Sequence, residues 1–206
     1  MPEYYISETT AILSNVSVII AAWAAFVGIS VWKKEFLGKR KIELAEEIFI
    51  LFYQVRDAIK HIRSPASFGG EGASVKAKLD NPEETAEIPD QVFVVHERYD
   101  RHKEIFSRLQ SLRYRFTLHF PEEDTKSFDE IENIVREIFS STRKYTRIAR
   151  VIRDSQNPDK EREKYRDKIQ KCEDTFWLAD EENETITPRL DSIIAKIDKI
   201  CKKTVK

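Results

Sequence analysis

Few residues in this sequence have the types and spacing that a catalytic or metal site requires. A di-iron site in a helical bundle needs a glutamate followed three residues later by a histidine, and the sequence contains no such pair. Residues 96–100, HERYD, begin like the zinc motif His-Glu-x-x-His but end in aspartate, so we interpret them as a solvated helix face. Phosphate-binding glycine loops and nucleophile elbows do not occur either. The sequence therefore predicts no metal and no cofactor.

One arginine and one histidine have a spacing known from ribonucleases. Residues 56–61, RDAIKH, are similar to the Arg-polar-x3-His motif of the HEPN superfamily of helical-bundle ribonucleases. The resemblance implies that His61 acts as acid or base on a ribose hydroxyl while Arg56 stabilises the phosphate charge. Arg113 and His119 have an allowed spacing too. A membrane-tethered HEPN-like ribonuclease is therefore the alternative hypothesis for function, and it predicts RNA cleavage that His61→Ala abolishes.

A row of arginines is the main candidate for binding anions. Arg136, Arg143, Arg147 and Arg150 fall on one side of a predicted helix, and such a stripe can bind phosphates or acidic partners. We interpret it as a solvated face, because arginine late in a helix complements the helix dipole and no aromatic residue is interleaved there to stack on bases. The formal net charge of −1 also gives no global electrostatic reason to expect a nucleic-acid partner.

The longest uncharged stretch runs from Thr9 to Trp32, TTAILSNVSVIIAAWAAFVGISVW. A helix needs about 20 mostly apolar residues to cross a hydrocarbon core of about 30 Å, so the stretch predicts a transmembrane helix. The preceding residues, MPEYYISE, lack the basic region of a cleaved signal peptide. We therefore interpret the helix as a retained anchor. The alternative is a helix buried in a soluble core.

Basic residues directly after this stretch predict its orientation. The five residues are Lys33, Lys34, Lys39, Arg40 and Lys41. By the positive-inside rule, the basic flank of a span stays in the cytoplasm. We expect a short external N-terminus (1–8), a transmembrane helix (9–32) and a cytoplasmic region (33–206), with the lipid bilayer as one partner.

The cytoplasmic region shows the apolar spacing of packed helices. Apolar residues recur at alternating intervals of three and four, which is typical of helices in a bundle or coiled coil. The pattern predicts a helix over 33–63 and another over 89–119. Three further helices are predicted to begin at a capping box of Ser127 and Glu130, at Asn157-Pro158, and at Thr187-Pro188.

Residues 64–90 interrupt this pattern. The segment holds three of the five glycines and three of the seven prolines, so it predicts a long loop, either a mobile connector or a binding element. The fold class predicted for the whole chain is all-α. It has one N-terminal transmembrane helix followed by an up-and-down bundle of four to five long helices.

Residues 32–68 resemble an uncharacterised family of bacterial single-pass membrane proteins with a helical cytoplasmic domain. The resemblance implies a location in the bacterial inner membrane and supplies no activity.

Small residues in the span favour close helix contact and self-association. They are Ser17, Ala21 and Ala25, and separately Ala24 and Gly28. Our leading hypothesis is a membrane-anchored docking or scaffold module that binds a protein partner or a second copy of itself.

Overall fold

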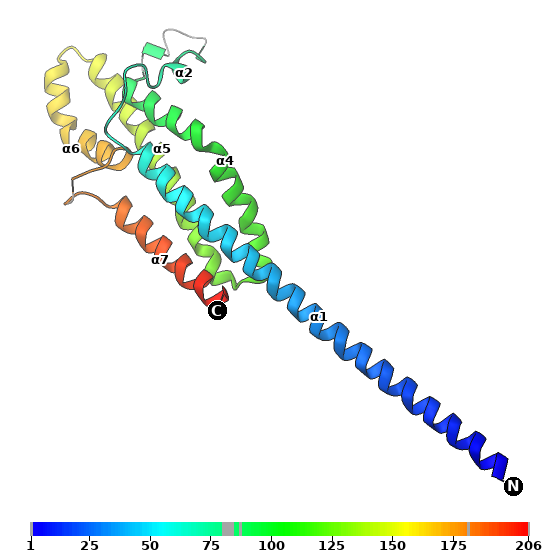
Figure 1. Cartoon of the computed structure of the whole chain (residues 1–206). Coiled ribbons are helices and arrows are strands. Elements are labelled where there is room, and N and C mark those ends of the chain that lie inside the picture. The colour runs from blue at the N-terminus through cyan, green and yellow to red at the C-terminus, as the bar shows by residue number, and fades with distance from the viewer. Residues whose placement is uncertain (1, 80–84, 87, 181, 206) are drawn as a thin grey trace. The chain divides into compact units, whose positions relative to one another are not determined.

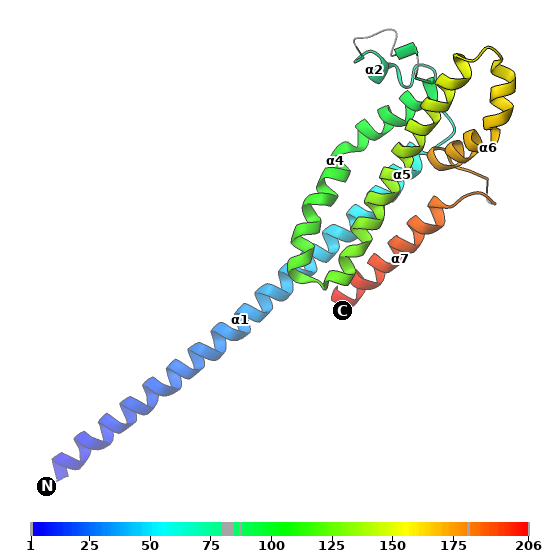
Figure 2. The same ribbon diagram turned by 180° about the vertical axis from the view of Figure 1, so that it is seen from behind.

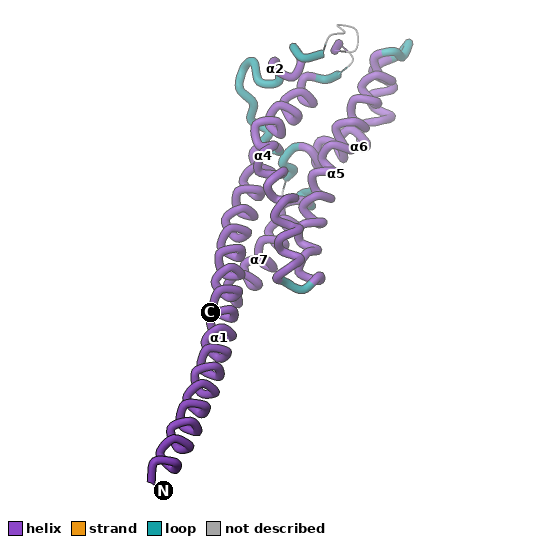
Figure 3. The backbone as a smooth tube through the Cα atoms, turned by 90° about the vertical axis from the view of Figure 1, so that its right-hand side faces the viewer, coloured by secondary structure: helices purple, strands orange, loops and turns teal. Residues whose placement is uncertain are grey.

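The protein is all-α in the computed structural model, which describes residues 2–79, 85–86, 88–180 and 182–205. Within these residues the helices are α1 (Pro2–Ile62), α2 (Ala73–Lys76), α4 (Asp90–His119), α5 (Glu122–Arg153), α6 (Pro158–Phe176) and α7 (Ile186–Val205) (Figure 1). The trace in Figure 3 shows helices joined by loops. The predicted fold class is thus confirmed. The chain divides into two compact units, residues 1–44 and 45–206.

The first unit is the N-terminal part of α1, whose side chains are described from Val16 onward. Every described side chain from Val16 to Arg40 is exposed, including Trp23 at 68% and Phe26 at 73%. Among the described residues, α1 is the one helix long and apolar enough to cross a membrane. The predicted external residues 1–8 and the first side chains of the predicted span, residues 9–15, lie outside the described side chains.

The second unit is a helical bundle with a continuous apolar core. The predicted apolar face of α1 is confirmed, since its members are buried, and Phe52 packs edge-on against Phe128 of α5 with ring centroids 4.9 Å apart. The helix α4 buries its predicted apolar face as well. The buried members of the two faces are Ala45, Ile48, Phe52, Val55, Ile59 and Ile62 of α1, and Val92, Val95, Phe106, Leu109 and Phe116 of α4.

Two helices share the surface of α5. The ion pairs Arg189–Glu137 and Lys196–Glu130 show that α7 runs antiparallel to α5 along its N-terminal half. The helix α6 follows α5 by a sharp turn and returns along its C-terminal half (Figure 2). Together α6 and α7 therefore occupy one position of the bundle, with a break between residues 177 and 185.

Helix starts differ from the sequence prediction at two places. The helix α5 begins at Glu122, directly after Pro121, and Ser127 is buried inside it, so the predicted capping box is wrong. Its acidic first turn, residues 122–124, complements the positive end of the helix dipole. The helix α7 begins at Ile186, one residue before the predicted Thr187-Pro188 start. The predicted Asn157 cap of α6 is confirmed, because its side chain accepts a hydrogen bond from the Lys160 amide at 3.1 Å.

The predicted loop 64–90 contains the short helix α2 and packs against α4. Residues 80–84 and 87 of this segment lie outside the described residues. Gly72 fits closely on α4: its φ is +92°, and a Cβ there would lie 3.0 Å from the Phe93 Cβ. Any other residue would strain the backbone and collide with α4. The loop is therefore fixed against α4 at Gly72, while most of its other described residues are exposed.

Candidate functional site

A large open cleft lies between α5 and α6, and it forms the candidate site. It is an open cleft of about 820 Å³ between residues 133–148 of α5 and 165–175 of α6. Pockets of 300–1,000 Å³ are typical of small-molecule sites. We call it the α5–α6 cleft. It is lined by Asn133, Arg136, Glu137, Ser140, Ser141, Arg143, Lys144, Arg147, Ile148, Tyr165, Lys168, Lys171, Cys172 and Thr175.

The cleft is strongly basic, with six cationic side chains and one carboxylate on its walls. That carboxylate, Glu137, accepts a hydrogen bond from Arg189 at 2.7 Å. One of the cations, Arg136, is paired with Glu132 at 2.8 Å. The other five are exposed: Arg143, Lys144 and Arg147 on α5, and Lys168 and Lys171 on α6.

Helix periodicity brings these charges together. Arg143 and Arg147 are one turn apart on α5, and Lys168 and Lys171 are one turn apart on α6, so each pair shares a helix face. The buried Cys172 lies on the same face of α6. Burial raises the pKa of its thiol despite the opposing effect of Lys144. The thiol therefore stays protonated at neutral pH and is a poor nucleophile.

An aromatic residue also lines the cleft, and it comes from α6 and not from the arginine stripe, whose members are exposed. Along α5 no aromatic is interleaved with the arginines, but α6 places Tyr165 in the same cleft. The Lys164 and Lys168 ammonium groups lie 5.1 and 5.3 Å from the centre of its ring. Sequence reasoning missed Tyr165, Lys168 and Lys171 because pairing between α5 and α6 leaves no local signal in the sequence.

The proposed ribonuclease pair, Arg56 and His61, contacts different partners. Because His61 follows Arg56 by five residues in a helix, the two side chains lie about 140° apart around the helix axis. Arg56 pairs with Asp57 at 2.9 Å and stacks 4.6 Å from the Tyr53 ring centre. His61 instead contacts α4, where its Nδ1 lies 2.9 Å from His102 Nε2.

This histidine pair predicts a pH dependence of stability. Burial, Arg98 and Arg101 lower the pKa of His61 below 6.5, against an opposing effect of Glu71. Burial, His61 and Arg101 lower the pKa of His102 below the same value. The unfolded chain then binds more protons than the folded one as the pH falls below about 6.5. We expect the thermal midpoint of the full chain in detergent to decrease between pH 7.5 and 5.5.

The variant His102→Gln should reduce this pH dependence, while the matched change His119→Gln should leave it as in the wild type. Circular dichroism at the two pH values measures the midpoints. An equal pH dependence in the wild type and in His102→Gln would contradict the assignment.

The sequence did not predict that two arginines are buried. The first is Arg98, which is 1% exposed and lies in the HERYD stretch, so the interpretation of that stretch as a solvated face is wrong. It pairs with the buried Glu71 at 2.8 Å and donates hydrogen bonds to the Ser64 and Ala66 carbonyls. The neighbouring Glu97 accepts a hydrogen bond from the Gly72 amide at 2.8 Å. These groups, the Arg98 cluster, attach the segment after α1 to α4.

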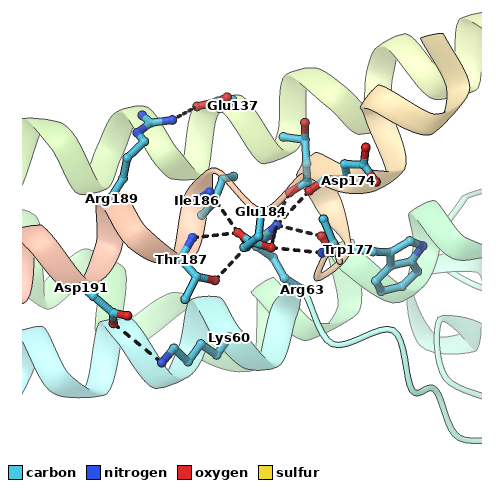
Figure 4. Close-up of polar contacts among 12 residues, drawn as sticks. Lys60, Arg63, Glu137, Asp174, Trp177, Glu184, Ile186, Thr187, Arg189 and Asp191 are labelled. Carbon is cyan, nitrogen blue, oxygen red and sulfur yellow. Dashed lines mark hydrogen bonds and ion pairs between the residues drawn. The ribbon is translucent and has the colours of Figure 1, made fainter. Parts of the chain in front are cut away.

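The second is Arg63, also 1% exposed, at the end of α1 (Figure 4). It forms an ion pair with Glu184 at 2.7 Å and donates to the carbonyls of Asp174, Thr175 and Trp177. Glu184 in turn accepts hydrogen bonds from three backbone amides, those of Ala179, Ile186 and Thr187. We call these groups the Arg63 cluster. It holds the break between α6 and α7.

The predicted membrane-flanking residues lie on α1 within the first unit. Lys33, Lys34, Lys39 and Arg40 are exposed and Lys41 is partly exposed. The Arg40 guanidinium lies 4.6 Å from the Phe36 ring centre. Within the described residues, no group of three or more His, Cys, Asp or Glu side chains has the arrangement of a metal site.

Fold and site together define an all-helical bundle protein that has one N-terminal candidate membrane helix and a basic cleft. Comparison of the chain with protein-family models, with curated proteins and with solved structures finds no match.

Proposed function

We propose that the protein is a membrane-anchored docking module. The N-terminal part of α1 inserts in the bacterial inner membrane, the bundle lies in the cytoplasm, and the α5–α6 cleft is the docking surface. The observation that carries the proposal is a helix whose apolar side chains are exposed from Val16 to Trp32, in one chain with a well-packed bundle.

Exposure of these side chains supports the anchor. Apolar side chains in a soluble protein gain about 1.5–3 kcal/mol each from burial, and in this part of α1 none of the described ones is buried. Lipid provides that burial without any protein partner. The five basic residues at 33–41 favour retention of the following region in the cytoplasm.

The cleft supports docking, since a rigid bundle presents it in a fixed geometry. The helices on its two sides bury core residues, including Ile134 and Ile138 of α5 and Phe176 of α6. Its six cationic side chains are exposed. A partner with negative charge fits such a surface.

Membrane insertion and orientation are tested in a bacterial host. We expect the full chain to stay in the membrane fraction after carbonate washing, and a variant lacking residues 1–32 to become extractable. A green fluorescent protein fused after Lys206 should fluoresce, while alkaline phosphatase at the same place should stay inactive. Replacement of all five flanking basic residues by glutamate should produce a population with active phosphatase. Complete release of the full chain by carbonate would refute the anchor.

Docking at the cleft is tested separately with a photo-reactive amino acid at position 144. We expect crosslinks that a matched probe at the exposed position 199 of α7 does not form. The same crosslinks from both positions would mean that the cleft has no special role.

A further inference from the structure

We propose that the α5–α6 cleft binds a nucleotide, with its di- or triphosphate group on Arg143, Arg147 and Lys171 and its base on Tyr165. This inference rests on the proposed function, because it names the ligand class of the same docking surface. Three observations carry it: unpaired positive charge, the placement of guanidinium groups, and a single aromatic ring beside them.

The charge of the cleft is not neutralised by the protein. Among the described residues, no carboxylate lies within ion-pair distance of Arg143, Lys144, Arg147 or Lys171. Most other arginines near α5 and α6 do have such partners, as in Arg136–Glu132 and Arg166–Glu163. The whole chain has a net charge of −1, so this local excess is a feature of the cleft. Like charges held close together repel, and a bound polyanion relieves that repulsion.

The types of these side chains suit phosphate. Guanidinium groups one helical turn apart lie about 5–6 Å apart at their Cβ atoms and donate paired hydrogen bonds to phosphate oxygens. Lys144 and Lys171 add flexible point charges from the two walls. Ser140 and Thr175 line the same space. The Thr175 hydroxyl donates to the Lys171 carbonyl at 2.8 Å, so it can offer a ligand an acceptor oxygen. A chain of two or three phosphates offers enough oxygens for all of these donors.

The aromatic content distinguishes a mononucleotide from a nucleic-acid strand. Proteins that bind single strands stack successive bases on several aromatic side chains. This cleft is lined by one aromatic residue, Tyr165. The Lys164 and Lys168 ammonium groups lie 5.1 and 5.3 Å from the centre of its ring, so a base that stacks on this ring takes the place of a lysine ammonium group. One base and one phosphate chain match a cleft of about 820 Å³.

Calorimetric titration of the full chain in detergent with ATP tests the proposal. We expect saturable binding that weakens as salt is raised. The double variant Arg143→Glu/Arg147→Glu should weaken it by at least about tenfold, since each hydrogen bond between charged groups contributes about that factor. The matched control is Arg166→Glu, which lies on α6, lines another groove and should bind as the wild type does. No saturable binding, or an equal loss in the control, would overturn the proposal.

Further ligands separate the parts of the site. Tripolyphosphate should bind more weakly than ATP, and Tyr165→Leu should remove that difference, whereas Tyr165→Phe should keep it. Equal affinity of wild type for ATP and tripolyphosphate would refute the role of Tyr165. A single-stranded RNA oligonucleotide that displaces ATP and binds more tightly would overturn the mononucleotide assignment. Carbonate washing of the same variants distinguishes loss of this site from failure of the anchor.

Discussion

Arg63→Ala should lower the free energy of unfolding of the bundle by about 3–5 kcal/mol, the usual effect of breaking a buried ion pair by removing one partner. The substitution leaves the Glu184 carboxylate, whose side chain is 10% exposed, without its counter-charge. It also removes the donors for three carbonyls at the end of α6. The segment between α6 and α7 then loses the side-chain contacts that join it to the end of α1.

The acid dependence of this effect follows from Glu184. Burial raises the pKa of Glu184, but hydrogen bonds from Arg63 and from backbone amides outweigh burial and lower the pKa from 4.5 to about 2. The folded state therefore binds fewer protons than the unfolded state between these pH values. This stabilisation is present above pH 4.5 and is lost as the pH falls toward 2. The difference between wild type and Arg63→Ala should shrink over the same range.

Urea unfolding of the full chain in detergent measures the effect, with Trp177 as a fluorescent reporter beside the cluster. The control is Arg189→Ala, which breaks the exposed Arg189–Glu137 pair and should cost about 0–1 kcal/mol. If both variants lost the same stability, the Arg63 cluster would be no more than a surface contact.

Arg98→Ala should have an effect of similar size, about 3–5 kcal/mol, for the same reason. Glu71, 5% exposed at its side chain, would remain as a buried carboxylate with only the more distant Arg101 at 3.5 Å. The carbonyls of Ser64 and Ala66 would lose their donor. We expect the segment between α1 and α4 to detach from α4 before the rest of the bundle unfolds.

Amide hydrogen exchange measures this local effect. Exchange in residues 68–79 should accelerate in Arg98→Ala, while exchange in α5 and α7 should change much less. The control Arg108→Ala breaks an exposed pair with Glu47 and should leave residues 68–79 unaffected. Uniform acceleration over the whole bundle would contradict a local role.

The two clusters are neighbours. The Arg98 guanidinium lies 5.6 Å from the Trp177 ring centre, and the Trp177 carbonyl accepts a hydrogen bond from Arg63 at 2.8 Å. Residues in one network show non-additive effects. The double variant should therefore differ from the sum of the single variants by about 0.5 kcal/mol or more, whereas Arg63→Ala combined with Arg108→Ala should be additive.

Local periodicity determined much of this protein. The apolar faces of α1 and α4, the Asn157 cap and the uncharged N-terminal stretch are all patterns within one segment, and the structure confirms the first two and the cap. A helix positions residues three and four apart on one face whatever surrounds it. The sequence alone is therefore sufficient to predict an apolar helix face. The membrane role of the N-terminal stretch stays a prediction.

The burial and pairing of the charged residues could be found only from the tertiary structure. Arg63 and Glu184 are 121 residues apart, and Arg98 and Glu71 are 27 apart with α2 between them. From sequence, both arginines look like solvated helix residues, because burial of a charge depends on a partner brought close by folding. The α5–α6 cleft likewise exists only because α6 turns back on α5 and places Tyr165, Lys168 and Lys171 opposite the arginines. Which helices contact each other depends on packing, and the residue spacing within one helix does not predict its neighbours.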